Sequence, residues 1–184
     1  MKSMKIKSLT VFTAALLVFG MVSGASALTI DPTWTPNWTG TETSNSLIMV
    51  RVNTILSGLG YGSYTELYKQ NYGGSEEGSL AASYMTTFSG DPNNAVITYV
   101  GGPYIAPPPV FVLVKDGNAT PSWYLFQTNW NGLETLYLNN FWLGPGGAIS
   151  HVSLLGTTAV PEPVTLLLLG LGLVGVAGIR RFKK

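Results

Sequence analysis

The stretch VFVLVKDGNATPSWYLFQ, residues 110–127, has the pattern that most clearly indicates a fold. Residues 110–115 are almost all apolar, as expected of a strand that is buried on both faces. Asp116, Gly117 and Asn118 favour a tight turn, and the aromatic-rich residues 122–127 then predict a returning strand. The stretch therefore predicts two antiparallel strands near the middle of a β-sheet.

Further strands are predicted on both sides of this hairpin. In residues 47–56, Ile48, Val50 and Val52 alternate with Met49, Arg51 and Asn53, which favours a half-buried strand. Gly and Pro punctuate the joints between the apolar segments. The fold class expected from this spacing is all-β, an antiparallel sandwich or a jelly roll. The strands predicted outside the hairpin cover residues 47–56, 95–100, 134–143 and 148–155.

Two segments leave alternatives open. Residues 28–46, rich in Thr, Ser, Asn and Pro, are expected to form an irregular arm in which Trp34 and Trp38 either cap the domain edge or offer a sugar platform. Residues 61–90 combine tyrosines at helical spacing with several glycines, which disfavour a helix. They are expected to form either two short strands joined by a loop at residues 71–78 or one helical turn.

The amino terminus has the three parts of a secretory signal peptide. Lysines precede a mostly apolar run at residues 11–22, and small residues follow at Ala25 and Ala27. The apolar run is much shorter than the ~20 residues that span a bilayer, which disfavours an uncleaved anchor helix. Signal peptidase is therefore expected to cut after Ala27 and leave Leu28 as the first residue.

The carboxyl end has the composition of a membrane anchor. Residues 164–179 carry no charge, and a helix of that length spans ~24 Å, close to the hydrocarbon core once snorkelling cations extend it. Basic residues follow, and the positive-inside rule places them in the cytoplasm and the middle of the chain outside. The cations expected to set this orientation are Arg180, Arg181, Lys183 and Lys184.

Pro161, Glu162 and Pro163 precede the apolar segment. Each proline fixes φ and favours an extended predecessor, which suits recognition by a membrane-embedded enzyme and equally suits a simple spacer. This triplet, a Leu/Gly-rich span and a basic tail together resemble the PEP-CTERM sorting signal of exported bacterial proteins. The resemblance implies processing by an exosortase, a membrane cysteine protease-transpeptidase, in systems that accompany exopolysaccharide production.

The composition of the exported part limits which partners and which chemistry it can have. Residues 28–159 carry three basic and eight acidic residues, a net charge of −5, although the whole chain sums to +1. A basic footprint for nucleic acid is therefore absent from this part, and no nucleic-acid partner is expected. The chain has no cysteine, which excludes disulfides, thiolate catalysis and cysteine metal sites.

Candidate catalytic and metal-binding residues are few. His151, the only histidine, is expected on a strand face with Ile149 and Ser153, where a hydrogen-bonded structural role is commoner than a Ser–His dyad or a metal ligand. Glu134 and Asp116 could serve a glycosidase only if the fold brought them together. The acidic loop at residues 71–78 lacks the regular ligand spacing of a calcium loop. No catalytic residue, metal or cofactor is therefore expected.

Trp130 is the remaining candidate for ligand contact. It lies in the polar sequence NWNG, residues 129–132, where core packing and contact with a glycan are equally open. A carbohydrate-binding module is accordingly the first alternative function, and a secreted polysaccharide hydrolase is the second.

The leading hypothesis is an exported, noncatalytic protein of the cell surface or matrix. It would be held briefly in the inner membrane by its carboxyl-terminal helix, processed near Pro161–Pro163 and then associated with extracellular polysaccharide or a biofilm. Retention of the helix as a permanent anchor is the alternative. The expected organisation is a signal peptide at 1–27, an irregular arm at 28–46, a β-rich ectodomain at 47–159 and a sorting signal at 160–184.

Overall fold

The computed structural model describes residues 27–35, 37–62 and 64–159. Two β-sheets and one α-helix make up most of this part, so the expectation of a mostly β fold is confirmed. In chain order the elements are β1 (Ala27–Ile30), β2 (Asn37–Gly40), α2 (Asn45–Gly58), β3 (Thr65–Asn71), β4 (Glu76–Glu77), the 3-10 turn η2 (Ala81–Ser83), β5 (Tyr84–Ser89), β6 (Asn94–Tyr99), β7 (Tyr104–Asp116), β8 (Trp123–Thr128), β9 (Thr135–Leu138) and β10 (Ile149–Ala159).

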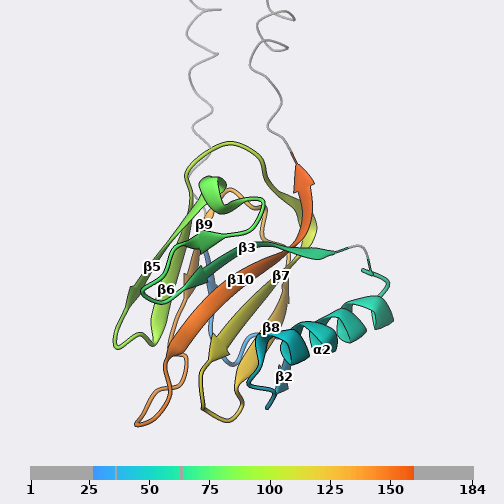
Figure 1. The fold of residues 1–184 in the computed structure, drawn as a ribbon. Helices are drawn as coiled ribbons and strands as arrows, with labels where there is room; N and C mark the ends of the chain where they lie inside the picture. The colour runs from blue at the N-terminus through green and yellow to red at the C-terminus, as the bar shows by residue number, and fades with distance from the viewer. Residues whose placement is uncertain (1–26, 36, 63, 160–184) are drawn as a thin grey trace, which may run out of the picture.

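The hairpin predicted at residues 110–127 lies inside the larger sheet. This sheet has six strands in the order β2-β8-β7-β10-β3-β4, all antiparallel. The register pairs Val110 with Thr128 and Lys115 with Trp123. The smaller sheet has the order β1-β9-β6-β5, and only its β1–β9 pair is parallel among the described strands (Figure 1).

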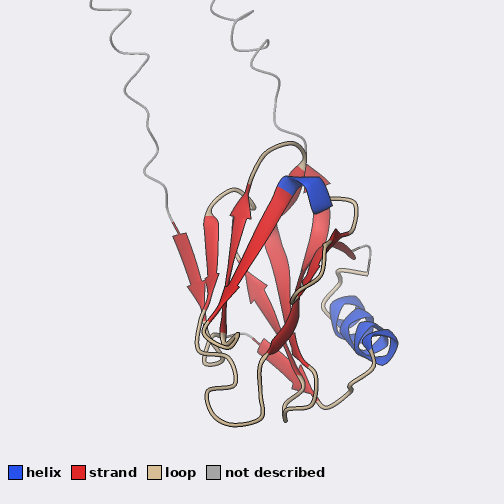
Figure 2. Cartoon of the chain, turned by 60° about the vertical axis from the view of Figure 1, so that its left-hand side comes forward, coloured by secondary structure: helices blue, strands red, loops and turns tan. Residues whose placement is uncertain are grey.

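Both faces of strand β7 are apolar, and each is covered by another part of the domain. Val110, Val112 and Val114 belong to the core between the two sheets. Phe111 and Leu113 point the other way, into a second core under helix α2. Figure 2 shows α2 against the outer side of the six-stranded sheet, where Ile48, Val52 and Leu56 face Trp123, Leu125 and Leu155.

The prediction of a strand at residues 47–56 is wrong, because this segment forms α2. Ile48, Val52 and Leu56 recur every four residues and are all buried, so the segment also satisfies a helical period. Ser44 caps the helix by accepting a hydrogen bond from the Leu47 backbone N–H at 3.4 Å. The apolar residues of this segment fit both the two-residue period of a strand and the 3.6-residue period of a helix. The segment forms a helix because its apolar side then covers the outer face of the six-stranded sheet.

The structure assigns the two segments, residues 28–46 and 61–90, for which the sequence left alternatives. Residues 28–46, expected to be irregular, contain most of β1 and all of β2. Residues 61–90 contain β3, β4 and β5 with a loop at 72–75, so the two-strand alternative is confirmed for the region around the loop. Trp34 and Trp38 are half-buried and pack against the two different cores, which agrees with capping of the domain edges.

Tyr84 joins three segments in the core between the sheets. Its hydroxyl accepts a hydrogen bond from the Ile105 backbone N–H at 2.9 Å and donates one to the Gly132 carbonyl at 2.8 Å. Burial raises the pKa of Tyr84 to about 12, which keeps the hydroxyl protonated and able to donate. Gly132 has φ +77°, and a Cβ there would lie 2.3 Å from the Ile105 carbonyl oxygen, so only glycine fits this close approach.

We expect Tyr84→Phe to lower the free energy of unfolding by about 2 kcal/mol, because it leaves the Ile105 N–H and the Gly132 carbonyl buried without a partner. Urea denaturation of the two proteins measures this difference. Tyr137→Phe is the matched control, since Tyr137 is 38% exposed, and its effect should stay below about 0.5 kcal/mol. Equal effects of the two substitutions would contradict the structural role of the Tyr84 hydroxyl.

Candidate functional site

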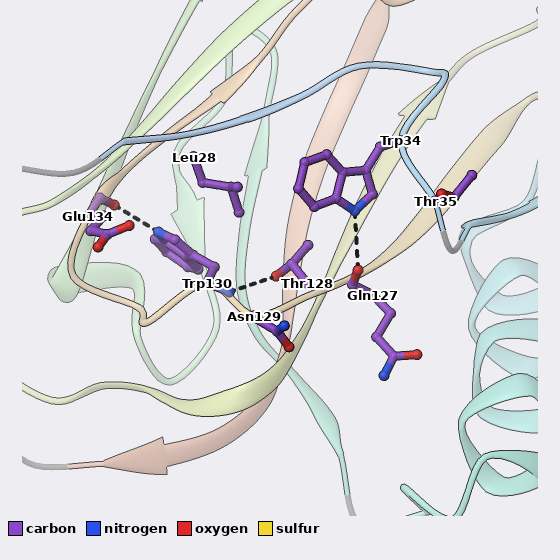
Figure 3. Close-up of a pocket in the computed structure, with 8 residues that line it drawn as sticks. All are labelled: Leu28, Trp34, Thr35, Gln127, Thr128, Asn129, Trp130 and Glu134. Atoms are coloured by element: carbon purple, nitrogen blue, oxygen red, sulfur yellow. Dashed lines mark hydrogen bonds between the residues drawn. The ribbon is translucent and has the colours of Figure 1, made fainter.

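A cleft of about 380 Å³ brings together residues from four parts of the chain. Strand β1 contributes Leu28, the loop after β1 contributes Trp34, and the end of β8 contributes Gln127. The loop between β8 and β9 contributes Trp130 and Glu134. Figure 3 shows these side chains around the hollow, with the amide of Asn129 and the Thr35 hydroxyl near its rim. The full lining is Leu28, Trp34, Thr35, Gln127, Thr128, Asn129, Trp130 and Glu134.

Trp130 is a core residue in this structure. Only 2% of it is exposed, its indole N–H donates to the Glu134 carbonyl at 2.9 Å, and its ring packs against Tyr84. A sugar that stacks on an aromatic side chain needs an open ring face, which Trp130 does not present. The candidate glycan contact at Trp130 is therefore corrected to a wall of the cleft that is anchored in the core.

Trp34 is the better exposed aromatic residue of the cleft. It is half-buried, and its indole N–H donates to the Gln127 carbonyl at 3.3 Å, which ties the loop after β1 to the end of β8 (Figure 3). The Asn37 side chain donates to the Trp34 carbonyl and holds the same loop from the other side. These contacts orient an indole that keeps part of its surface open to the cleft.

Glu134 supplies the only carboxylate among the cleft residues. The Asn131 side chain donates to its Oε1 at 2.8 Å, while the Asn131 side-chain oxygen accepts from the Glu134 backbone N–H at 3.0 Å. This reciprocal pair fixes the carboxylate at the rim. A carboxylate acceptor, four amide or hydroxyl side chains and a partly open indole are groups that suit a polar ligand with apolar patches, such as a sugar.

The structure does not bring Glu134 and Asp116 together. Glu134 lines the same cleft as Thr128, which pairs with Val110, whereas Asp116 ends β7 six residues farther along. At ~3.3 Å per residue, Val110 and Asp116 are about 20 Å apart along β7, so Asp116 lies at the end of the strand away from the cleft. Glycosidases need their two carboxyl groups within roughly 5–9.5 Å, so this placement disfavours such a pair.

Asp116 has a structural role instead. It is 3% exposed, and its Oδ1 accepts from the backbone N–H groups of Asn118 at 2.5 Å and Ala119 at 2.7 Å. Its Oδ2 accepts from the backbone N–H of Ala148. One carboxylate thus closes the β7–β8 turn and ties it to the loop before β10, at the end of β7 away from the cleft.

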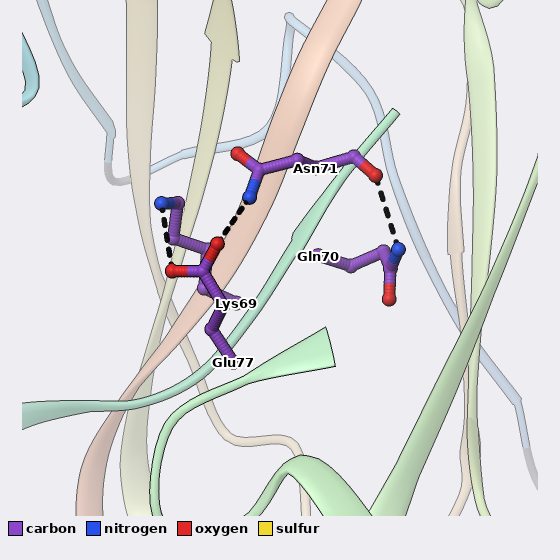
Figure 4. Close-up of polar contacts among 4 residues, drawn as sticks. All are labelled: Lys69, Gln70, Asn71 and Glu77. Carbon is purple, nitrogen blue, oxygen red and sulfur yellow. Dashed lines mark hydrogen bonds and ion pairs between the residues drawn. The ribbon is translucent and has the colours of Figure 1, made fainter. Parts of the chain in front are cut away.

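In the acidic segment around β4, the Glu77 carboxylate makes contacts within the fold. Glu77 Oε2 lies 3.2 Å from Lys69 Nζ, and Glu77 Oε1 accepts from the Asn71 side chain at 2.6 Å (Figure 4). The Gln70 side chain donates to the carbonyls of Asn71 at 3.0 Å and Gly74 at 2.6 Å. These contacts hold the short β4 against β3. Both oxygens of the Glu77 carboxylate therefore already have partners on β3.

His151 lies on the helix-covered face of the larger sheet and is 3% exposed. A register shift between Ile149 and His151 sends Ile149 into the core between the sheets, so the expected shared face with Ile149 is wrong, while Ser153 does share it. The Ser153 hydroxyl makes no hydrogen bond within the described residues, so no Ser–His dyad forms there. His151 instead borders a cavity of about 40 Å³ with Asn45, Glu66 and Lys69.

Burial lowers the pKa of His151 to about 3, and the positive charges of Lys69 and Lys115 act in the same direction. The imidazole is therefore neutral near pH 7, which agrees with a structural role. Burial also lowers the pKa of Lys115, although the neighbouring Asp116 opposes this. Lys115 is 6% exposed and donates to the Asp116 carbonyl at 3.0 Å.

We expect acid to destabilise the fold through His151. Its folded-state pKa lies below the ordinary value of about 6.5, so between pH 6.5 and about 3 only the unfolded chain binds this proton, and the free energy of unfolding falls as the pH falls. From pH 7 to 5 the loss should be about 2 kcal/mol larger in the parent chain than in His151→Gln. Urea denaturation at both pH values measures it. Because the chain has a single histidine, equal losses in both proteins would contradict this burial.

The predicted export and sorting residues lie mostly outside the described part of the chain. Only Ala27 and Leu28 of the signal-cleavage site are within it, and they begin β1. Ala25, the triplet Pro161–Pro163, the predicted helix 164–179 and the four terminal cations fall outside. Ala27 and Ala159, where the description begins and ends, lie at the same end of the two-sheet domain (Figures 1 and 2).

Within residues 27–35, 37–62 and 64–159, no helix combines the length and the apolar character needed to cross a bilayer.

Comparison with known proteins identifies the carboxyl end. The PEP-CTERM protein-sorting motif matches residues 159–181. No curated protein and no solved structure matches the chain. The motif implies an exported protein that is transiently anchored in the membrane and processed by an exosortase, a membrane protease. The resemblance based on Pro161, Glu162, Pro163 and the basic tail is therefore confirmed, and the chain carries a PEP-CTERM protein-sorting motif at residues 159–181.

Proposed function

We propose that the chain is a noncatalytic protein of the cell surface or extracellular matrix that associates with exopolysaccharide. The observation that carries this proposal is the sorting motif at residues 159–181, which implies export and release from a transient anchor. Leu28 would then begin the mature chain, and the β domain would be the part delivered outside. The matching position of Ala27 and Ala159 at one end of the domain supports this, since the opposite end is free to face outward.

The roles of the polar residues support a noncatalytic domain. Asp116 binds three backbone N–H groups, Glu77 pairs with Lys69 and Asn71, and His151 is buried and neutral. Each of these side chains is used to hold the fold. A carboxylate pair of Glu134 and Asp116 is disfavoured, because Glu134 lines the cleft near Thr128 and its partner Val110, and about 20 Å of β7 separate Val110 from Asp116.

The cleft favours a carbohydrate-binding module as the second candidate function. Sugars present polar hydroxyls and apolar C–H faces, and proteins bind them with aromatic rings beside amides and carboxylates. Trp34, Gln127, Asn129 and Glu134 offer this combination around one hollow. In this alternative Trp34, rather than the buried Trp130, supplies the ring on which a sugar stacks.

Replacement of the triplet Pro161-Glu162-Pro163 by three alanines should block processing, because the enzyme then loses the rigid carboxylate that it recognises. Intact-mass spectrometry of fractionated cells measures the outcome. The parent chain should lose Lys184 and leave the membrane fraction, whereas the variant should keep Lys184 and stay there. Glu76→Ala, which removes an exposed carboxylate from β4, is the control and should be processed normally. Parent protein that keeps Lys184 on the cell surface would instead indicate a permanent anchor.

If the cleft binds carbohydrate, Trp34→Ala should weaken binding on a glycan array roughly two- to tenfold, since one stacked ring contributes about 0.5–1.5 kcal/mol. Trp38→Ala is the matched control, because Trp38 is equally a half-buried tryptophan but packs on Phe111 under α2. Unchanged binding by Trp34→Ala, or equal losses in both variants, would rule out the cleft as the site.

The hydrolase alternative is tested by a turnover assay on the same glycans. It predicts turnover by the parent chain that Glu134→Gln abolishes.

A further inference from the structure

The outer face of the four-stranded sheet carries no acidic or basic side chain in strands β1, β5, β6 and β9. Strands alternate their side chains between the two faces, and the buried positions of this sheet point toward the other sheet. The positions between them form the outer face, which we call the neutral face. Its residues in the mature chain are Thr29 on β1, Met85, Thr87 and Ser89 on β5, Asn94, Val96 and Thr98 on β6, and Thr135 and Tyr137 on β9.

The register places the members of the neutral face side by side. Thr87 pairs with Val96, Val96 pairs with Tyr137 and Tyr137 pairs with Thr29, so one row crosses all four strands. Tyr137 is 38% exposed near the middle of this row, and Met85 is 49% exposed on β5. The face is thus a flat array of methyl groups and hydroxyls around one open phenol ring. Helix α2 lies on the other sheet and leaves this face open (Figure 2).

Charge is distributed unevenly over the domain. Residues 28–159 carry three basic and eight acidic side chains, yet none lies in β1, β5, β6 or β9. A nucleic acid or an acidic polysaccharide would find no cation on the neutral face and would be repelled by the net charge of −5. The absence of charge therefore matches a partner that is itself neutral.

The area of the neutral face limits the shape of this partner. Four strands ~4.8 Å apart and four to six residues long at ~3.3 Å per residue enclose roughly 300 Å². A stable protein–protein interface buries about 800 Å² on each partner, so the face is too small to hold a second copy of the chain alone. A single polymer chain laid across the strands needs no more than this area.

We propose that the neutral face binds neutral polysaccharide, with Tyr137 as its central contact. Sugar C–H groups pack on the phenol ring and on the threonine methyl groups, and sugar hydroxyls exchange hydrogen bonds with the threonine hydroxyls. This inference rests on the proposed association with exopolysaccharide and names the polymer class and the surface. The neutral face is separate from the cleft, because β1 turns Leu28 toward the cleft and Thr29 toward the neutral face.

The test is affinity electrophoresis of the full chain in a polyoxyethylene detergent, with hydroxyethylcellulose as the neutral probe and polygalacturonate as the acidic probe. We expect retardation by hydroxyethylcellulose only. Tyr137→Ala removes the ring and Thr87→Glu adds a charge to the face, and each should weaken retardation at least tenfold. Asn53→Glu adds the same charge to the exposed side of α2 and is the matched control, with no expected change.

Several outcomes would overturn the inference. They are absence of retardation by hydroxyethylcellulose, equal retardation by polygalacturonate, normal retardation of Tyr137→Ala and Thr87→Glu, and self-association that these two variants abolish. Retardation lost in Trp34→Ala but kept in the face variants would assign binding to the cleft, which overturns this inference and leaves the proposed function standing. Loss of Lys184 in the exported protein is read out separately, so a failure of the sorting proposal is distinguished from a failure of the neutral face.

Discussion

Burial of strand β7 on both of its faces is the constraint on which the rest of the structure depends. Val110, Val112 and Val114 hold the smaller sheet against the larger one, and Phe111 and Leu113 hold helix α2 on the opposite side. The chain has no cysteine, so no disulfide can take over part of this task. Each apolar side chain buried in this way contributes roughly 1.5–3 kcal/mol, and a polar residue at any of these positions would remove cover from one of the two cores.

Most of the polar chemistry inside the domain serves this packing. Asp116 closes the β7–β8 turn, the Tyr84 hydroxyl joins β5 to the start of β7 and to the loop after β8, and Glu77 holds β4 to β3. A buried polar atom costs free energy unless it has a partner, which explains why these side chains are fully engaged. Two surfaces keep groups available for other molecules: the cleft around Trp34 and the neutral face around Tyr137.

The sequence predicted the elements whose signals are local. Residues 110–127 form the expected hairpin because a two-sided apolar run followed by Asp116-Gly117-Asn118 fits few other structures. The prediction failed at residues 47–56, where apolar side chains satisfy periods of both two and 3.6 residues and contact with the sheet decides. The sequence could not decide between core packing and glycan contact for Trp130, because its polar neighbours in sequence do not show that its ring packs on Tyr84 in the core.

The sorting motif at residues 159–181 and the β class of the domain can both be recognised in the sequence, because each is encoded in a continuous stretch of residues. Which distant residues meet became known from the folded structure. It joined Leu28 and Trp34 to Glu134 in one cleft, separated Glu134 from Asp116, and aligned Thr87, Val96, Tyr137 and Thr29 across four strands. Strand pairing and core burial act between segments remote in sequence, so neither segment alone shows which partner it meets.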